Sequence, residues 1–261
     1  MINLIIFILI ISNLILFFLI NKKKIKNFFY KSKISTVSVS ELNKIFETQK
    51  IDNKIYGPKK DVIIKSFCIS PENKIVGMTS NYEAWIIGCL SKVSKNIFEF
   101  GTCSGKSTYI MALNSKDDSK IITLTLNPKK IDKISNKKGD NKISYRNMID
   151  ESIYNKFLFS GSNEEKKIKV IFQNSVNFDE TKYKGFFDLI FIDGGHTYNI
   201  VKNDTRKAFY MLNNKGIILW HDYVSGKTSS KDVVKFINEI AKKKKIFRIK
   251  NTSLCFFKNI I

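Results

Sequence analysis

The segment from Asn96 to Met111, NIFEFGTCSGKSTYIM, constrains the fold of this 261-residue chain more than any other. It reads as a short apolar strand, a glycine turn and a helix that opens with small and hydroxyl residues. Gly101 allows the backbone to turn where a Cβ would clash, and Gly105 allows a ligand close to the first helical turn. The free N–H groups of such a turn face the ligand. Glu99, just before the turn, favours a ligand with positive charge, such as an adenosyl cofactor with a sulfonium.

Strand and helix signals alternate along the rest of the chain. Strands are predicted at 97–101, 120–126, 169–172, 187–193, 217–220, 246–250 and 254–258, and helices at 80–93, 106–114, 198–212 and 231–243. The lysine-rich stretch 128–167 is irregular, with one short helix near 149–159. Repeated β-α units predict an α/β fold with a doubly wound, mostly parallel, seven-stranded Rossmann-like sheet. The last two strands are joined by a short turn and form an antiparallel C-terminal hairpin.

The N-terminus predicts a membrane anchor. Residues 1–20 carry no charge, and about 20 apolar residues are enough to span a bilayer. Lysines between Lys22 and Lys33 follow and favour a cytoplasmic flank. A cleaved signal peptide is the alternative, but no basic segment precedes the apolar run and no small-residue cleavage site follows it. The expected organisation is a transmembrane helix at 1–21, a basic juxtamembrane extension at 22–78 and a cytoplasmic catalytic domain at 79–261.

The composition argues against nucleic-acid binding, although the formal net charge is +22. Only three of the 45 basic residues are Arg, the residue that base and phosphate recognition usually recruits. The four cysteines have no metal or redox spacing, which indicates reduced, mostly buried thiols.

Two strand ends carry the residues best suited to chemistry. The chain has two histidines, His196 and His221, and each follows a predicted strand close to an aspartate, Asp193 or Asp222. Ligands of parallel sheets bind outside the carboxyl ends of the strands, so these residues are expected near the glycine turn. Histidine titrates near neutrality and is a candidate general base. Asp193, His221 and Asp222 are also candidate ligands of a divalent cation such as Mg²⁺. The structural alternative is that both histidines only stabilise strand ends.

These residues lie in motifs that resemble the class I S-adenosylmethionine-dependent methyltransferases. The branch they resemble is methyltransferase domain family 24, which is related to the macrocin-type O-methyltransferases. The resemblance spans about residues 80–258, and its most specific part is the DGGHTY and WHDY pair. The motifs are FEFGTCSGKST, TLTLNP, FQNSVNFD, FDLIFIDGGHTYNIVKNDTRKA, LNNKGIILWHDY and TSLCFFK.

The resemblance implies a role for each matching residue. S-adenosylmethionine would contact the glycine turn with its methionine part, the end of the second strand with its ribose, and the segment 173–175 with its adenine. The implied cofactor-binding residues are Glu99, Gly101, Thr102, Ser104, Gly105, Thr125, Asn174, Ser175 and Asp193. The implied catalytic residues are Asp193, His196, His221 and Asp222, with Asp193 beside the methyl group and the others around the acceptor.

Two positions depart from the family pattern. The family usually has an acid where this chain has Thr125, and often an acid where it has Asn174. Each change is expected to weaken cofactor binding by about 1–3 kcal/mol if the groups are buried. A catalytically degenerate, membrane-anchored binding module of the same fold is therefore the non-enzymatic alternative.

The expected function is direct SN2 transfer of a methyl group to a hydroxyl of a small molecule or sugar, with a histidine as general base. A nucleotide hydrolase with a P-loop is a weaker alternative. The P-loop has four residues between its glycines, whereas three residues separate Gly101 from Gly105. The sequence identifies neither the acceptor nor the oligomeric state.

Overall fold

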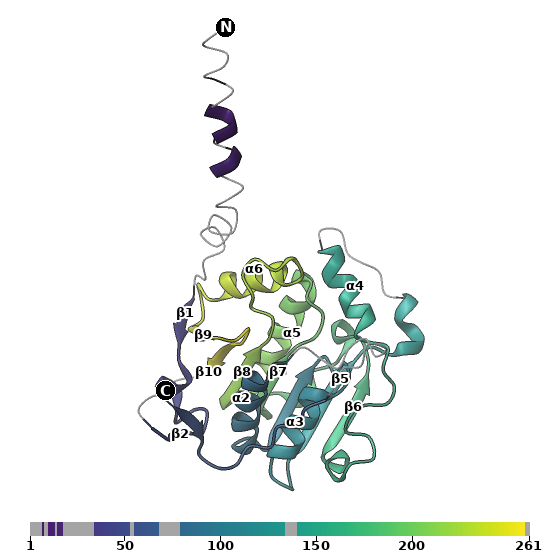
Figure 1. The fold of residues 1–261 in the computed structure, drawn as a ribbon. Helices are drawn as coiled ribbons and strands as arrows, with labels where there is room; N and C mark the ends of the chain where they lie inside the picture. Colours follow the sequence, from purple (N-terminus) through teal and green to yellow (C-terminus); the bar gives the residue numbers. More distant parts are fainter. Residues whose placement is uncertain are drawn as a thin grey trace.

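The computed structural model describes residues 7, 10–13, 15–17, 34–52, 55–67, 79–133 and 140–258 (Figure 1). The strands are β1 Ser35–Val37, β2 Thr48–Lys50, β3 Tyr56–Pro58, β4 Asn96–Phe100, β5 Lys120–Thr125, β6 Ile168–Phe172, β7 Phe187–Ile192, β8 Leu212–Trp220, β9 Ile246–Ile249 and β10 Cys255–Lys258. The helices are α2 Asn81–Lys92, α3 Lys106–Asn114, α4 Lys142–Asp150, α5 Tyr198–Met211 and α6 Lys231–Ile240. Short 3₁₀ turns connect them, among them η4 Ser175–Asn177 and η6 Thr228–Ser230.

The main sheet has the strand order β1-β9-β10-β8-β7-β4-β5-β6. The pairs from β8 to β6 are parallel, whereas β10 is antiparallel to both β8 and β9. The chain starts the parallel part at β4, continues outward to β5 and β6, and returns to β7 on the other side of β4. The expected Rossmann-like sheet with a C-terminal hairpin is therefore present, and its strand order reverses beside β4.

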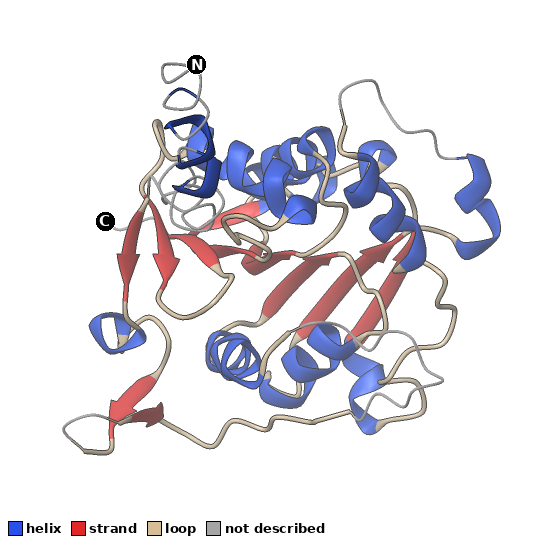
Figure 2. Ribbon diagram, turned by 45° about the horizontal axis from the view of Figure 1, so that its top comes forward, coloured by secondary structure: helices blue, strands red, loops and turns tan. Residues whose placement is uncertain are grey.

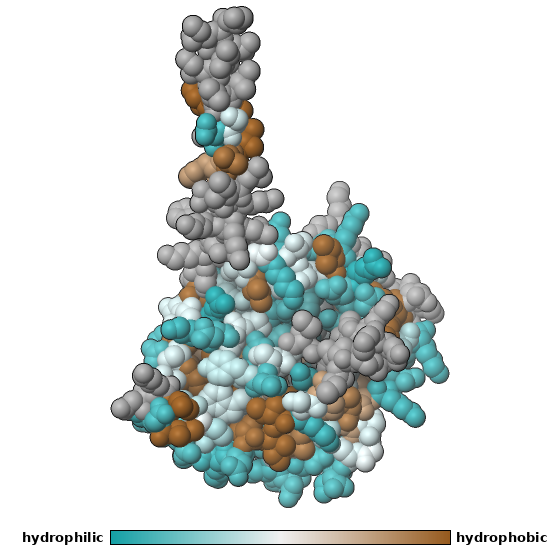
Figure 3. All heavy atoms as spheres, in the orientation of Figure 1, coloured by the Kyte–Doolittle hydropathy of each residue, from teal (hydrophilic) through white to brown (hydrophobic). Residues whose placement is uncertain are grey.

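Helices cover both faces of this sheet, with α2 and α3 on one side and α5 and α6 on the other (Figure 2). Neighbouring residues of a strand point to opposite faces, so Ile97 packs with the α2/α3 layer and Phe98 with the α5/α6 layer. Both side chains are fully buried. Two covered faces explain why the central strands read as continuous apolar runs. On the face shown in Figure 3, hydrophilic groups surround a few clusters of apolar side chains.

Local signals fix the helix starts. Ser80 caps α2 through the predicted capping box: the Glu83 N–H donates to the Ser80 hydroxyl at 3.2 Å, and the Ser80 N–H donates to the Glu83 carboxylate at 2.9 Å. Asn141 caps α4, because its side-chain oxygen accepts from the Ile143 N–H at 2.9 Å. Helix α4 therefore begins at Lys142 and ends at Asp150, whereas the sequence predicted a short helix near 149–159.

The sheet has eight strands rather than the predicted seven, because β1 from the N-terminal extension pairs in parallel with β9. A three-residue strand is too short to show a periodic pattern. The extension also contributes Phe46, which is fully buried with its ring edge-on to Phe256 at 5.5 Å between centroids.

The predicted transmembrane helix at 1–21 is wrong. A bilayer span needs about 20 residues of continuous apolar helix. Of residues 1–21, the structure describes only 7, 10–13 and 15–17. No helix within the described ranges is both long enough and apolar enough to cross a membrane. The expected localisation, a single-pass membrane protein with a cytoplasmic catalytic domain, therefore does not stand. The lysines of 22–33 lie outside the described residues.

The buried central strands predict a large stability cost for a cavity in them. Ile190 of β7 is fully buried, and replacing it by Ala should lower the free energy of unfolding by about 2–5 kcal/mol. Ile153, which is 62% exposed, gives the matched control, because Ile153→Ala should change stability by less than about 0.5 kcal/mol. Urea denaturation followed by circular dichroism measures both. Equal effects would contradict the assigned core.

Candidate functional site

A cavity lies at the carboxyl ends of β4, β5 and β7, where the strand order reverses. Ligands of open parallel sheets bind at this place. The end of α4 and the start of α5 complete the wall. The lining residues are Phe100, Gly101, Cys103, Leu124, Thr125, Leu126, Met148, Glu151, Ser152, Gln173, Asn174, Ser175, Asp193, Gly194, Gly195, Ile200 and Asp204.

The turn after β4 brings two strand ends together. Gly101 has a φ of +96°, and a Cβ added there would lie 2.2 Å from the backbone oxygen of Asp193. The Gly101 N–H donates to the Leu124 carbonyl at 2.8 Å, and the Asp193 N–H donates to the Phe100 carbonyl at 2.9 Å. Only glycine tolerates both this backbone conformation and this contact. Gly101 thus places the Asp193 side chain at the mouth of the turn.

Glu99 is sealed inside the protein and does not line the cavity. Its carboxylate accepts hydrogen bonds from Ser107 at 2.5 Å, from Thr123 at 2.6 Å and from the Thr108 hydroxyl. Burial raises the pKa of Glu99 to about 7, although these hydroxyl donors oppose the shift. The carboxylate therefore joins β4, β5 and the first turn of α3.

The implied cofactor-binding residues fall into two groups. Gly101, Thr125, Asn174, Ser175 and Asp193 line the cavity, and Glu99, Thr102, Ser104 and Gly105 do not. The Thr102 hydroxyl shares a 2.6 Å hydrogen bond with that of Thr123. At Gly105 the close neighbours are Phe159 and Phe157, which a Cβ would approach to 2.7 and 2.9 Å. This glycine therefore admits aromatic side chains of its own chain beside the helix start.

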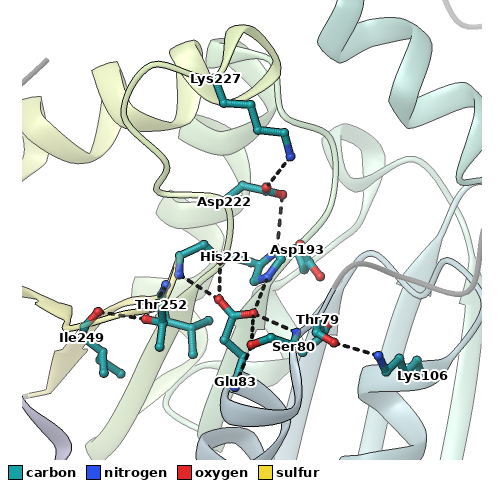
Figure 4. Close-up of polar contacts among 12 residues, drawn as sticks. Thr79, Ser80, Glu83, Lys106, Asp193, His221, Asp222, Lys227, Ile249 and Thr252 are labelled. Carbon is teal, nitrogen blue, oxygen red and sulfur yellow. Dashed lines mark hydrogen bonds and ion pairs between the residues drawn. The ribbon is translucent and has the colours of Figure 1, made fainter. Parts of the chain in front are cut away.

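His221 lies among carboxylates from three elements (Figure 4). Its Nδ1 is 2.9 Å from Asp193 and 3.3 Å from Asp222, and its Nε2 is 3.7 Å from Glu83. Burial alone would lower the pKa of His221, but Asp193 and the other carboxylates outweigh it and hold this pKa well above its usual value. Glu83 also accepts from the Ser253 N–H at 2.7 Å. Acidic groups therefore lie near both ring nitrogens of His221 and favour its protonated form.

His196 has a simpler environment. Its Nε2 lies 3.0 Å from Asp222, whose other oxygen is 3.7 Å from Lys227. Burial favours the neutral ring, but the Asp222 carboxylate outweighs burial and raises the pKa of His196 to about 9. Asp222 has a φ of +60°, and its pKa is well below the usual value, because the two imidazoles outweigh its burial. The predicted residues Asp193, His196, His221 and Asp222 therefore form one cluster.

The cluster also contains a donor set suited to a divalent cation. One ligand atom each from Asp193, His196 and Asp222 lies within 4.8 Å of the others. The predicted set had His221 in place of His196. Two carboxylates and an imidazole suit such an ion, although each carboxylate is already paired with an imidazole. Binding the metal would therefore release a proton from His196.

Several site residues escaped prediction. The capping box identified Glu83 as a helix cap, but its contact with His221 links residues far apart in sequence. Glu151 and Met148 reach the cavity from α4, which only the cap at Asn141 signals. Asp204 lies on the buried side of α5, and burial raises its pKa to about 6.

Comparison with known proteins places this site in a family context. Residues 98–223 match the family model of a methyltransferase domain, and this range contains the whole histidine and aspartate cluster. No curated protein matches the chain in sequence.

Two solved structures share the fold. One, described as an O-methyltransferase from Klebsiella pneumoniae, has a TM-score of 0.50 and 15% identity, over 71% of this chain and 84% of that chain. The other, described as a caffeoyl-CoA O-methyltransferase from Staphylococcus aureus, has a TM-score of 0.50 and 18% identity, over 70% of this chain and 86% of that chain. At these identities the likeness supports the fold alone.

The contact at Gly101 predicts a specific sensitivity. Gly101→Ala should lower the free energy of unfolding by more than about 4 kcal/mol, because the new Cβ would meet backbone atoms that cannot move away. Gly161 is the matched control, since its φ is +78° but a Cβ there meets nothing within 4 Å. Gly161→Ala should cost only about 1–2 kcal/mol of backbone strain. Similar losses in the two variants, measured by chemical denaturation, would refute the close approach of the two strand ends.

Proposed function

We propose that this chain, whose residues 98–223 match the family model of a methyltransferase domain, is a class I S-adenosylmethionine-dependent methyltransferase that methylates a hydroxyl group of a small molecule or sugar. The observation that carries the proposal is the position of the cavity. It is lined by the glycine turn and by Asp193, the one member of the histidine and aspartate cluster among its described lining residues. A methyl donor bound at the turn would present its methyl group to the cluster.

The cavity suits S-adenosylmethionine along its length. The backbone at Gly101 is open to the methionine part, and Asp193 lies beside it. Thr125 and Leu126, at the end of β5, would contact the ribose, and Asn174 and Ser175 would lie near the adenine. When bound, the cofactor supplies an electrophilic methyl group on a positively charged sulfur.

The two departures from the family pattern have different environments. Thr125 is buried in the cavity wall, where its hydroxyl replaces the carboxylate that usually holds the ribose. Asn174 caps η4, because its side-chain oxygen accepts from the Val176 N–H at 2.9 Å. A carboxylate is not needed for this cap. Thr125 is thus the position at which we expect cofactor affinity to be lost.

The protein has two tasks in a direct SN2 transfer: to align the acceptor oxygen with the methyl group and to remove its proton. His196 is the better base of the two histidines. In the described part of the chain its one ion-pair partner is Asp222, whereas His221 has carboxylates at both ring nitrogens. Asp222 orients His196, and His221 holds Asp193 in place.

The positive charge of a bound cofactor would affect the protonation of His196. Asp222 raises the pKa of His196 to about 9, which favours a proton on this ring at neutral pH. His196 would lose this proton more readily with a positively charged ligand nearby, because such a charge disfavours the imidazolium, and the neutral ring could then accept the acceptor's proton.

Isothermal titration calorimetry of the full chain tests the cofactor. S-adenosylmethionine and S-adenosylhomocysteine should both bind, because both fit the adenine, ribose and methionine parts of the cavity. ATP should not bind, because the turn lacks the residue spacing that encloses a β-phosphate. Binding of ATP alone would reverse the assignment in favour of a nucleotide hydrolase. Binding of no ligand would favour a degenerate module.

Turnover tests the base. His196→Ala should slow methyl transfer by about a hundredfold to ten-thousandfold, with the Kd for S-adenosylmethionine unchanged. The assay follows S-adenosylhomocysteine released with a panel of sugar and catechol hydroxyls, each with Mg²⁺ and with EDTA. Lys202→Ala, on the exposed side of α5, is the control and should retain full activity. Wild-type rates in both His196→Ala and His221→Ala would exclude a histidine base, and loss of activity in EDTA would favour the cation.

A further inference from the structure

Glu151 is a carboxylate in the cavity wall that the proposed mechanism does not use. It follows directly after α4, and its N–H donates to the Asn147 carbonyl at 2.9 Å. Its side chain has no hydrogen bond or ion pair with any other residue that the structure describes. Burying a carboxylate without a partner beside a cavity raises the free energy of the folded protein, unless a charged or polar ligand binds there.

The structure holds Glu151 firmly in this place. The Ser144 hydroxyl of α4 donates to the Ser229 carbonyl of η6 at 2.8 Å, and the Asn141 side chain donates to the Thr228 carbonyl at 2.8 Å. At the other end of α4, the Met148 side chain lies close to Gly195. A Cβ added to Gly195 would be 2.8 Å from the Met148 sulfur. Helix α4 is therefore anchored across the strand ends, and Glu151 faces the glycine turn.

The charged groups around Glu151 are already paired. His196 lies with Asp222, and His221 lies with Asp193 and Glu83. Burial raises the pKa of Glu151 to about 7, and Asp193 and Asp222 add to this shift while the two histidines oppose it. None of the ion pairs among the described residues includes Glu151, so its side chain has no ion-pair partner of its own there.

The methionine end of S-adenosylmethionine carries an ammonium and a sulfonium, and it needs an acidic partner. The sequence predicted that Glu99 pairs with this positive charge. The Glu99 carboxylate is instead buried behind the turn, where it accepts hydrogen bonds from three hydroxyls. Asp193 lines the same part of the cavity but is held by His221. Glu151 is the cavity carboxylate that remains free among the described residues.

We propose that the Glu151 carboxylate binds the cationic methionine end of the cofactor. This inference rests on the proposed function. It assigns a cofactor contact to α4, an element outside the glycine turn and the strand ends. Pairing with the cofactor would satisfy both the free carboxylate and the positive charge of the ligand.

Titration calorimetry of Glu151→Gln with S-adenosylmethionine tests this inference. The variant should bind about tenfold to hundredfold more weakly than the wild type, because a charged hydrogen bond is replaced by a neutral one. Asp150→Asn is the matched control: it removes the same charge from the neighbouring, exposed position of α4 and should bind like the wild type. Glu151→Ala is a second variant with the same expected loss, and thermal melting checks that each protein is folded.

S-adenosylhomocysteine, which has the ammonium but no sulfonium, identifies the partner group. An equal loss with both ligands assigns the contact to the ammonium, and a larger loss with S-adenosylmethionine assigns it to the sulfonium. Wild-type affinity of folded Glu151→Gln and Glu151→Ala for both ligands would overturn the inference and leave the proposed function intact. Failure of the wild-type protein to bind either ligand would instead refute the proposed function.

Discussion

The buried carboxylate of Glu99 is the interaction on which the site depends. It accepts hydrogen bonds from the hydroxyls of Thr123 in β5 and of Ser107 and Thr108 in the first turn of α3. One side chain therefore holds a strand pair and the start of a helix together. Burying an acid is costly unless its oxygens are satisfied, and here three hydroxyls satisfy them. Because the turn between β4 and α3 is held from inside, its outer side is free to face a ligand.

The second constraint is charge balance at the strand ends. Asp193, Asp222 and Glu83 converge there around His221 (Figure 4), and His196 pairs with Asp222. Glu151 adds a further acid that has no ion-pair partner among the described residues. Acidic groups in excess over cations make the cavity receptive to a positively charged ligand, and S-adenosylmethionine is such a ligand. The residues that position the acceptor and those that attract the cofactor thus belong to one electrostatic system.

The sequence predicts those parts of the fold that local patterns determine. Periodicity and capping give β4, α3 and α2, and the two strand ends correctly bring His196 and His221 together. Features that depend on distant contacts were not predictable: β1 is three residues long, and Glu83 meets His221 only through the folded sheet. Glu99 was assigned to the ligand because its position before the turn is visible in sequence, whereas the side on which its carboxylate lies is not. The N-terminus fitted a membrane span by its length, its lack of charge and the lysines that follow it, but no helix among the described residues can cross a membrane.

The central claim is that the cavity beside Gly101 holds S-adenosylmethionine with its methyl group toward the histidine cluster. A crystal structure of the protein with S-adenosylhomocysteine tests it most directly. The account predicts the adenine beside Asn174, the ribose beside Thr125, and the sulfur between Glu151 and His196. A ligand bound elsewhere, or one whose sulfur points away from both histidines, would contradict the account.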